Sequence, residues 1–76
     1  FLTAEQMERA LQTARGRLAN LRYGDLARAQ NTLSRAERSG DFRAMSVARG
    51  RLEDVRGRIT DAETKLRLLA GDALYN

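Results

Sequence analysis

The residues of this chain that could do chemistry are arginines, carboxylates and serines, and their spacing limits what they can do. The sequence has neither Cys nor His, so it lacks a thiolate nucleophile, the commonest metal ligand and the usual base at neutral pH. Glu53 and Asp54 are adjacent and point in different directions around a helix, while Asp61 and Glu63 fall on its outer face. No phosphate-binding loop or calcium-loop spacing is present. We therefore expect no enzymatic activity, no small-molecule substrate, no metal ion and no cofactor.

Arginine dominates the remaining polar chemistry. Lys65 is the only Lys among fourteen basic residues, and ten acidic residues leave a net charge of +4. The segment 14–18, Ala-Arg-Gly-Arg-Leu, returns at 48–52, and 56–59 repeats its centre. In each copy the central Gly falls on the outermost helix position and the two arginines flank an apolar position. These repeats, together with Arg22, supply the candidate contacts to an acidic partner or to phosphate groups: Arg15, Arg17, Arg22, Arg49, Arg51, Arg56 and Arg58.

The same arginines leave two kinds of partner open. An acidic protein surface is the first expectation, because Tyr23 is the only aromatic residue near the arginines and nucleic-acid binding usually adds aromatic stacking. Nucleic acid is the second. A chain folded back near residue 40 would bring Arg22 toward Arg56 and give Arg15 a chance of meeting Glu63. A GC-rich coding sequence would also explain the abundance of Arg without any binding role.

The elements that position these residues are all expected to be helices. Pro is absent, and good helix formers fill most positions. Thr3 and Gln6 form a capping-box sequence at the start of the first helix. Apolar residues then recur at alternating steps of three and four, first as Met7, Leu11, Ala14, Leu18 and Leu21, and next, displaced by one residue, as Leu26, Ala29, Leu33 and Ala36. The third and longest series is typical of a coiled coil and consists of Met45, Ala48, Leu52, Val55, Ile59, Ala62, Leu66 and Leu69.

The dipeptide Gly-Asp interrupts these series at residues 24–25, 40–41 and 71–72. Gly can end a helix in the left-handed conformation, and Asp can cap the next helix. We expect residues 1–76 to form one helical domain, an antiparallel helical hairpin of coiled-coil type with arms at about 3–38 and 41–70, kinked near Gly24. The alternative is a three-helix bundle in which Gly24 turns a corner.

A chain of this length buries little of its surface, and two packed helices cannot cover both of their faces. In a hairpin the two chain ends meet, so large apolar side chains gather where the layer is thinnest. We expect this end to bind another subunit, either a second copy or a larger assembly protein. The candidate protein-binding residues are Leu66, Leu68, Leu69, Leu74, Tyr75, Phe1 and Leu2.

The opening segment 2–7, Leu-Thr-Ala-Glu-Gln-Met, followed by Ala10, Leu11, Ala14, Leu18, Leu21 and Gly24, resembles the first helix of small head–tail joining proteins of tailed bacteriophages. That family usually has a β-hairpin between two helices, whereas 27–38 is expected to be helical here. The resemblance implies a virion component that inserts into a ring at the portal.

Taken with the residue patterns, this resemblance predicts a structural, assembly or adaptor protein. The alternatives are a basic nucleic-acid-binding protein and a small helical secretion chaperone. No apolar run is long enough to cross a bilayer, so we expect a soluble protein of the cytoplasm or of a virion that does not bind membranes.

Overall fold

The structure, a computed structural model, describes the backbone of residues 2–75 and the side chains of residues 2–71. Its elements are α1 (Ala4–Asn20), the π-helical turn η1 (Leu21–Asp25), α2 (Leu26–Ser39) and α3 (Phe42–Tyr75). No strand occurs in the described part of the chain. The predicted all-helical fold is confirmed, and α2 covers the segment in which the head–tail joining family usually has a β-hairpin.

The start of α1 follows the predicted capping box. The backbone N–H of Gln6 donates to the Thr3 hydroxyl over 3.1 Å, and the Thr3 N–H donates to the Gln6 side-chain oxygen over 2.9 Å. Two backbone donors that a helix start leaves without partners are thereby satisfied.

The one-residue displacement of the apolar series falls on η1. The Leu26 N–H donates to the Leu21 carbonyl, five residues earlier, so this turn contains one residue more than an α-helical turn. The extra residue returns the displaced series to the same face. Gly24 therefore turns no corner and does not adopt the left-handed conformation, and Asp25 makes no side-chain capping bond at the start of α2. The alternative of a three-helix bundle, in which Gly24 turns a corner, is wrong, and the first arm of the expected hairpin continues as helix from Ala4 to Ser39.

The second Gly-Asp dipeptide does make the turn. Gly40 lies in the left-handed region with φ of 72° and ends α2, where a residue with a Cβ atom would be strained. The Asp41 carboxylate accepts the N–H groups of Arg43 and Ala44 and so caps the start of α3. The third dipeptide has no such effect, because α3 continues through Gly71 to Tyr75.

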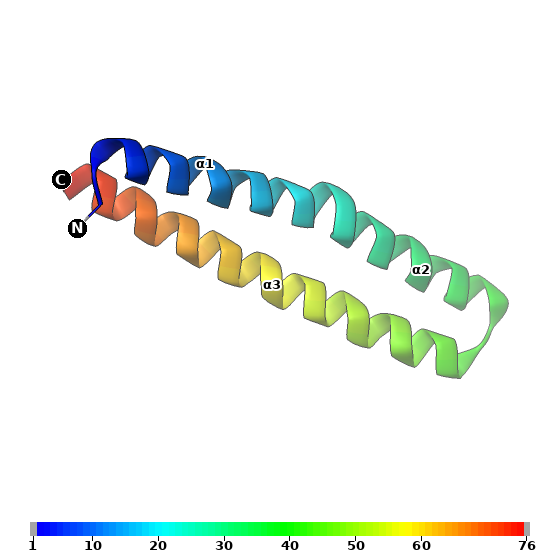
Figure 1. The fold of residues 1–76 in the computed structure, drawn as a ribbon. Helices are drawn as coiled ribbons and strands as arrows, with labels where there is room; N and C mark the ends of the chain where they lie inside the picture. Colours follow the sequence, from blue (N-terminus) through cyan, green and yellow to red (C-terminus); the bar gives the residue numbers. More distant parts are fainter. Residues whose placement is uncertain (1, 76) are drawn as a thin grey trace.

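The overall arrangement is hairpin-like and elongated. After the turn, α3 runs back alongside α2 and then α1, so that both ends of the chain lie at the same end of the molecule (Figure 1). The principal extents are 53 × 15 × 14 Å and the radius of gyration is 16.7 Å, whereas a compact domain of this length would have about 11 Å.

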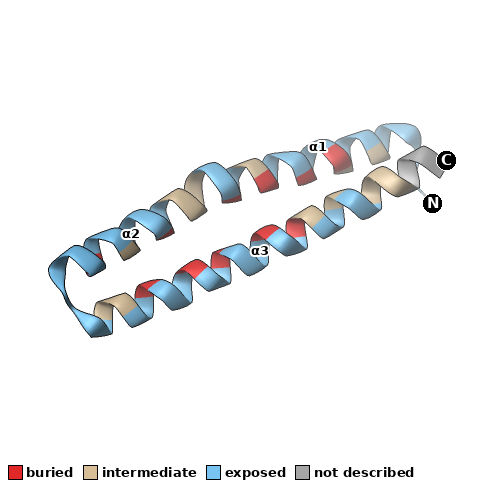
Figure 2. Ribbon diagram, turned by 180° about the vertical axis from the view of Figure 1, so that it is seen from behind, coloured by how far each residue is buried: buried red, intermediate tan, exposed pale blue. Residues whose placement is uncertain are grey.

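The core is a single seam between the two arms. Its buried residues face the opposite arm, and the outward surfaces of both arms are exposed (Figure 2). Every member of the three predicted apolar series is buried or half-buried. The central cluster consists of Leu18, Leu21, Ala29, Leu52, Val55, Ile59 and Ala62. Even the most enclosed core residues, Ala29 and Ala48, retain 3% exposure, as expected when the core is only one layer thick.

Candidate protein-binding surfaces

The predicted apolar end is only partly exposed. Leu68 is 67% exposed and Leu2 is 53% exposed. Leu66 packs against the core cluster and Leu69 is half-buried. Phe1 and the side chains of Leu74 and Tyr75 lie outside the described residues. Of the predicted residues that can be placed, Leu68 and Leu2 are thus the two whose large apolar side chains stay mostly exposed.

Three other large side chains are exposed that were not among the predicted protein-binding residues. Tyr23 on η1 and Phe42 at the start of α3 are both 82% exposed, and Val47 is 65% exposed. They lie on different elements or different faces, so they do not extend the apolar end. Single exposed apolar residues are common on protein surfaces.

All seven candidate arginines are exposed. Arg22 contacts Glu63 across the seam at 3.4 Å, Arg56 contacts Glu53 at 3.5 Å, and Arg58 contacts Asp54 at 3.1 Å. The other four, Arg15, Arg17, Arg49 and Arg51, have no carboxylate within 4.0 Å among the described side chains.

Arg15, which had a chance of meeting Glu63 in a folded-back chain, does not pair with it among the described side chains. Glu63 lies at the same edge of the seam as Arg22 and pairs with that residue instead. Arg56, which we expected near Arg22, has its own carboxylate one turn away on α3.

The arginines do not form one band, because they divide between the two edges of the seam. Residues one position before and one position after a seam residue lie about 100° to either side of it. Arg22 and Glu63 therefore mark one edge, which their ion pair spans from η1 to α3. Arg17 and Arg58 lie at the other edge. No ion pair between described residues crosses between the arms there, and we call it the open edge.

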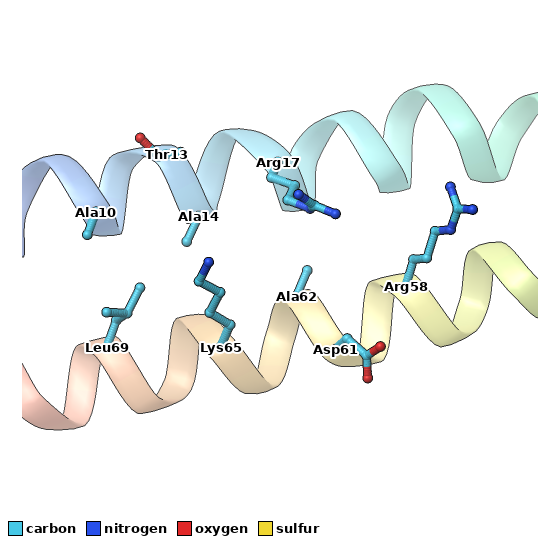
Figure 3. A pocket seen from close by; sticks show the side chains of 9 residues that line it. All are labelled: Ala10, Thr13, Ala14, Arg17, Arg58, Asp61, Ala62, Lys65 and Leu69. Atoms are coloured by element: carbon cyan, nitrogen blue, oxygen red, sulfur yellow. The ribbon is translucent and has the colours of Figure 1, made fainter.

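A groove follows the open edge between α1 and α3 and encloses about 520 Å³. Ala10, Ala14 and Ala62 form its floor. In Figure 3 the side chains of Arg58 and Lys65 rise from α3 toward α1, whereas the Asp61 carboxylate points away from α1. The complete lining is Ala10, Thr13, Ala14, Arg17, Arg58, Asp61, Ala62, Lys65 and Leu69. The groove therefore has an apolar floor of short side chains with positively charged side chains around its rim.

Comparisons with protein-family models, with curated proteins and with solved structures return no match. The interpretation of these surfaces therefore rests on their geometry and charge.

No polar or charged side chain among the described residues is buried, and no group of three or more acidic residues among them could hold a metal ion. Within the described residues, no helix has the length and apolar character needed to span a membrane.

The sequence analysis missed Lys65 as part of a binding surface. It occupies the same edge as Arg51 and Arg58 because the three residues are seven apart, which is two helical turns. The seven-residue spacing of these three cations in the sequence already indicated that they share one edge of the helix. The repeated Arg-Gly-Arg segments combine residues from both edges and do not include Lys65.

Proposed function

We propose that this chain is a non-enzymatic assembly or adaptor protein that binds larger protein protomers through apolar residues of its helical seam, at the end where the two chain termini meet, and through arginine contacts. The two arms, in this proposal, pack as an antiparallel coiled coil whose outer surfaces serve the partner. The observation that carries the proposal is the apolar end of the hairpin, where Leu68 keeps 67% and Leu2 keeps 53% of its surface exposed and Leu66 and Leu69 are only half-buried.

The thin core supports this role. One seam with Ala at many of its positions contributes little burial energy for each residue, since an Ala methyl removes little apolar surface from water. A partner that covers the outer face of α3 would add burial that the chain cannot supply alone.

One form of this role is a component of a phage virion. The support for that setting is the resemblance of 2–24 to the first helix of head–tail joining proteins. It is confined to the first arm, since α2 replaces the β-hairpin usual in that family.

Co-precipitation from the native source tests the proposal, with tagged wild-type chain and two variants. Leu68→Asp places a charge in the exposed apolar site, and we expect it to lose the partner. Thr64→Asp is the matched control, because Thr64 is exposed on the outer face of the same helix and its hydroxyl bonds only to the Thr60 carbonyl. A Leu68→Asp chain that retains the same partner as wild type would contradict the proposal, as would a wild-type chain that remains a monomer without any partner.

The antiparallel coiled-coil packing has its own test. Spin labels on cysteines introduced at Arg9 and Arg67, both exposed, should lie close together, because the two positions are near the same end of the hairpin. Labels at Arg9 and Arg43, which antiparallel arms place at opposite ends, should be far apart. Double electron–electron resonance measures both label–label distances. A longer distance for the Arg9–Arg67 pair than for the Arg9–Arg43 pair would exclude antiparallel arms.

Nucleic acid is the second candidate partner, and it is favoured by the four arginines that have no carboxylate neighbour among the described side chains. Titration of duplex and single-stranded DNA at two salt concentrations tests it. If several arginines contact phosphates, the affinity should fall steeply as salt rises. Micromolar binding that persists at physiological salt would place nucleic acid ahead of protein.

A further inference from the structure

We propose that the groove at the open edge binds an acidic amphipathic helix of a partner protein, which would complete a three-helix bundle with α1 and α3. This inference rests on the proposed protein-binding function and names the chemistry of the partner segment.

The shape of the groove favours an elongated occupant. A neighbouring hollow of about 550 Å³ shares Thr13, Arg17 and Arg58 with the groove and continues to Asp25. From Ala10 to Asp25 the trough spans fifteen residues, about 22 Å along the helix axis. That length matches about four turns of a third helix lying between α1 and α3.

A helical occupant also follows from the hydrogen-bonding groups that the walls offer. The backbone on both sides of the groove is helical, so its N–H and C=O groups are already paired. An extended peptide would leave its own backbone groups without partners in the groove, whereas a helix satisfies them internally.

The charges around the groove favour an acidic occupant. Arg17 and Lys65 have no carboxylate within 4.0 Å in the described part of the chain. Arg58 contacts Asp54 at 3.1 Å, but both side chains are about 60% exposed, and such a surface pair is too weak to prevent Arg58 from binding a partner carboxylate. The Asp61 carboxylate points away from α1 (Figure 3). Glu or Asp residues along one side of a bound helix would therefore meet three cations within two turns.

Two other occupants fit less well. A second copy of this chain, related by a two-fold axis, would bring the same three cations toward each other, and its net charge of +4 opposes association. A nucleic acid would use the cations but not the apolar floor formed by Ala10, Ala14 and Ala62.

The test uses a fluorescein-labelled, fifteen-residue helical peptide with Leu at three–four spacing and Glu at the flanking positions. One control peptide replaces every Glu with Lys, and a second has the acidic composition in an order without helical periodicity. Fluorescence anisotropy at physiological salt measures binding to the full chain. We expect saturable binding of the acidic periodic peptide, and binding at least about tenfold weaker for each control.

Variants of the chain locate the bound peptide. Arg17→Ala with Lys65→Ala should weaken binding by about tenfold or more, since two charge-assisted contacts are lost. The matched control is Arg9→Ala with Arg67→Ala, which removes the same charge from exposed positions outside the groove on the same two helices. We expect this control variant to bind the peptide with an affinity within about twofold of wild type, because salt screens charges that lie outside the groove. Circular dichroism of both variants checks that the helices remain folded.

The outcomes distinguish this inference from the proposed function. Equal binding of the acidic and basic peptides, equal losses in the two double variants, or no peptide binding would overturn the groove proposal. Displacement of the peptide by duplex DNA at equal concentration would also overturn it. If Leu68→Asp still abolishes co-precipitation in that case, the proposed protein-binding function stands without the groove.

Discussion

Three glycines lie on the outer faces of the long helices, and replacing them with Ala should stabilise the protein. Gly16, Gly50 and Gly57 are exposed, and a Cβ atom built at any of them meets no atom within 4 Å. Each is surrounded by several helical residues on both sides. Each pays the conformational cost of Gly in a helix, and nothing in the described structure uses its lack of a side chain.

The size of the effect follows from helix propensity. Ala is more favourable than Gly in a helix interior by about 0.8–1.0 kcal/mol. Gly50 and Gly57 are two turns apart and Gly16 lies on the other arm, so the three gains should be nearly additive. The triple variant should gain about 2.5–3 kcal/mol. Each single substitution should raise the melting temperature by about 4–8 °C in a domain of this size.

Urea unfolding followed by circular dichroism measures these gains as shifts of the midpoint at constant slope. Gly40→Ala is the matched control, because the same change at a residue with φ of 72° should destabilise by about 1–2 kcal/mol. If Gly50→Ala or Gly57→Ala lowered the midpoint, the outward placement of these residues would be incorrect. If Gly40→Ala raised it, the position of the hairpin turn would be incorrect.

Three further predictions concern the seam, the Arg22–Glu63 ion pair and the cap at Asp41. Leu52→Ala should lower the free energy of unfolding by about 2–5 kcal/mol because Leu52 is only 7% exposed. Leu68→Ala in the isolated chain should change it by less than about 0.5 kcal/mol. Equal effects of the two variants in urea unfolding would contradict the assigned core. Arg22→Glu should lower the free energy of unfolding by about 0.2–1 kcal/mol, and Glu63→Arg in the same chain should recover that stability. The difference between the single and double variants should shrink in high salt. A double variant that recovers no stability would show that the ion pair does not stabilise the fold. Asp41→Ala should cost about 0.5–2 kcal/mol because two N–H groups lose their acceptor, and an unchanged unfolding midpoint would argue against this cap.

The seam could be predicted because its apolar spacing is regular. From Met45 to Leu69 the steps of three and four continue without a break, and every residue of that series is buried or half-buried. The turn at Gly40 could also be predicted, since Gly supplies the left-handed conformation there and Asp41 supplies the cap. Local backbone preference and apolar pattern agree at these places.

The dipeptide at Gly24 was misleading because local preference and burial oppose each other there. Leu21 and Leu26 stand on either side, and both contribute to the seam against α3. Burying a Leu side chain contributes about 1.5–3 kcal/mol, more than the cost of about 1 kcal/mol for Gly in a helix. The chain therefore stays helical and accommodates the extra residue in η1.

The surface could be predicted only in outline. The repeated segments correctly placed exposed arginines beside the seam, but the partners of individual side chains depended on the register of the two arms. The free energies of alternative surface ion pairs differ by less than about 1 kcal/mol. Sequence alone therefore could not decide whether Glu63 would pair with Arg15 or, as the structure has it, with Arg22. The groove required α1 and α3 to be placed together before Lys65 gained a role.

The π-helical turn η1 also bears on how the length of this chain can change in evolution. Loss of one residue between Leu21 and Leu26 would convert the segment to a regular α-helix, and the apolar residues on both sides would still face α3. Loss of a residue elsewhere in either arm would rotate all later residues of that arm by about 100° and remove them from the seam. Descendants of this sequence should therefore tolerate a single-residue deletion at η1 and exclude it from the rest of both arms.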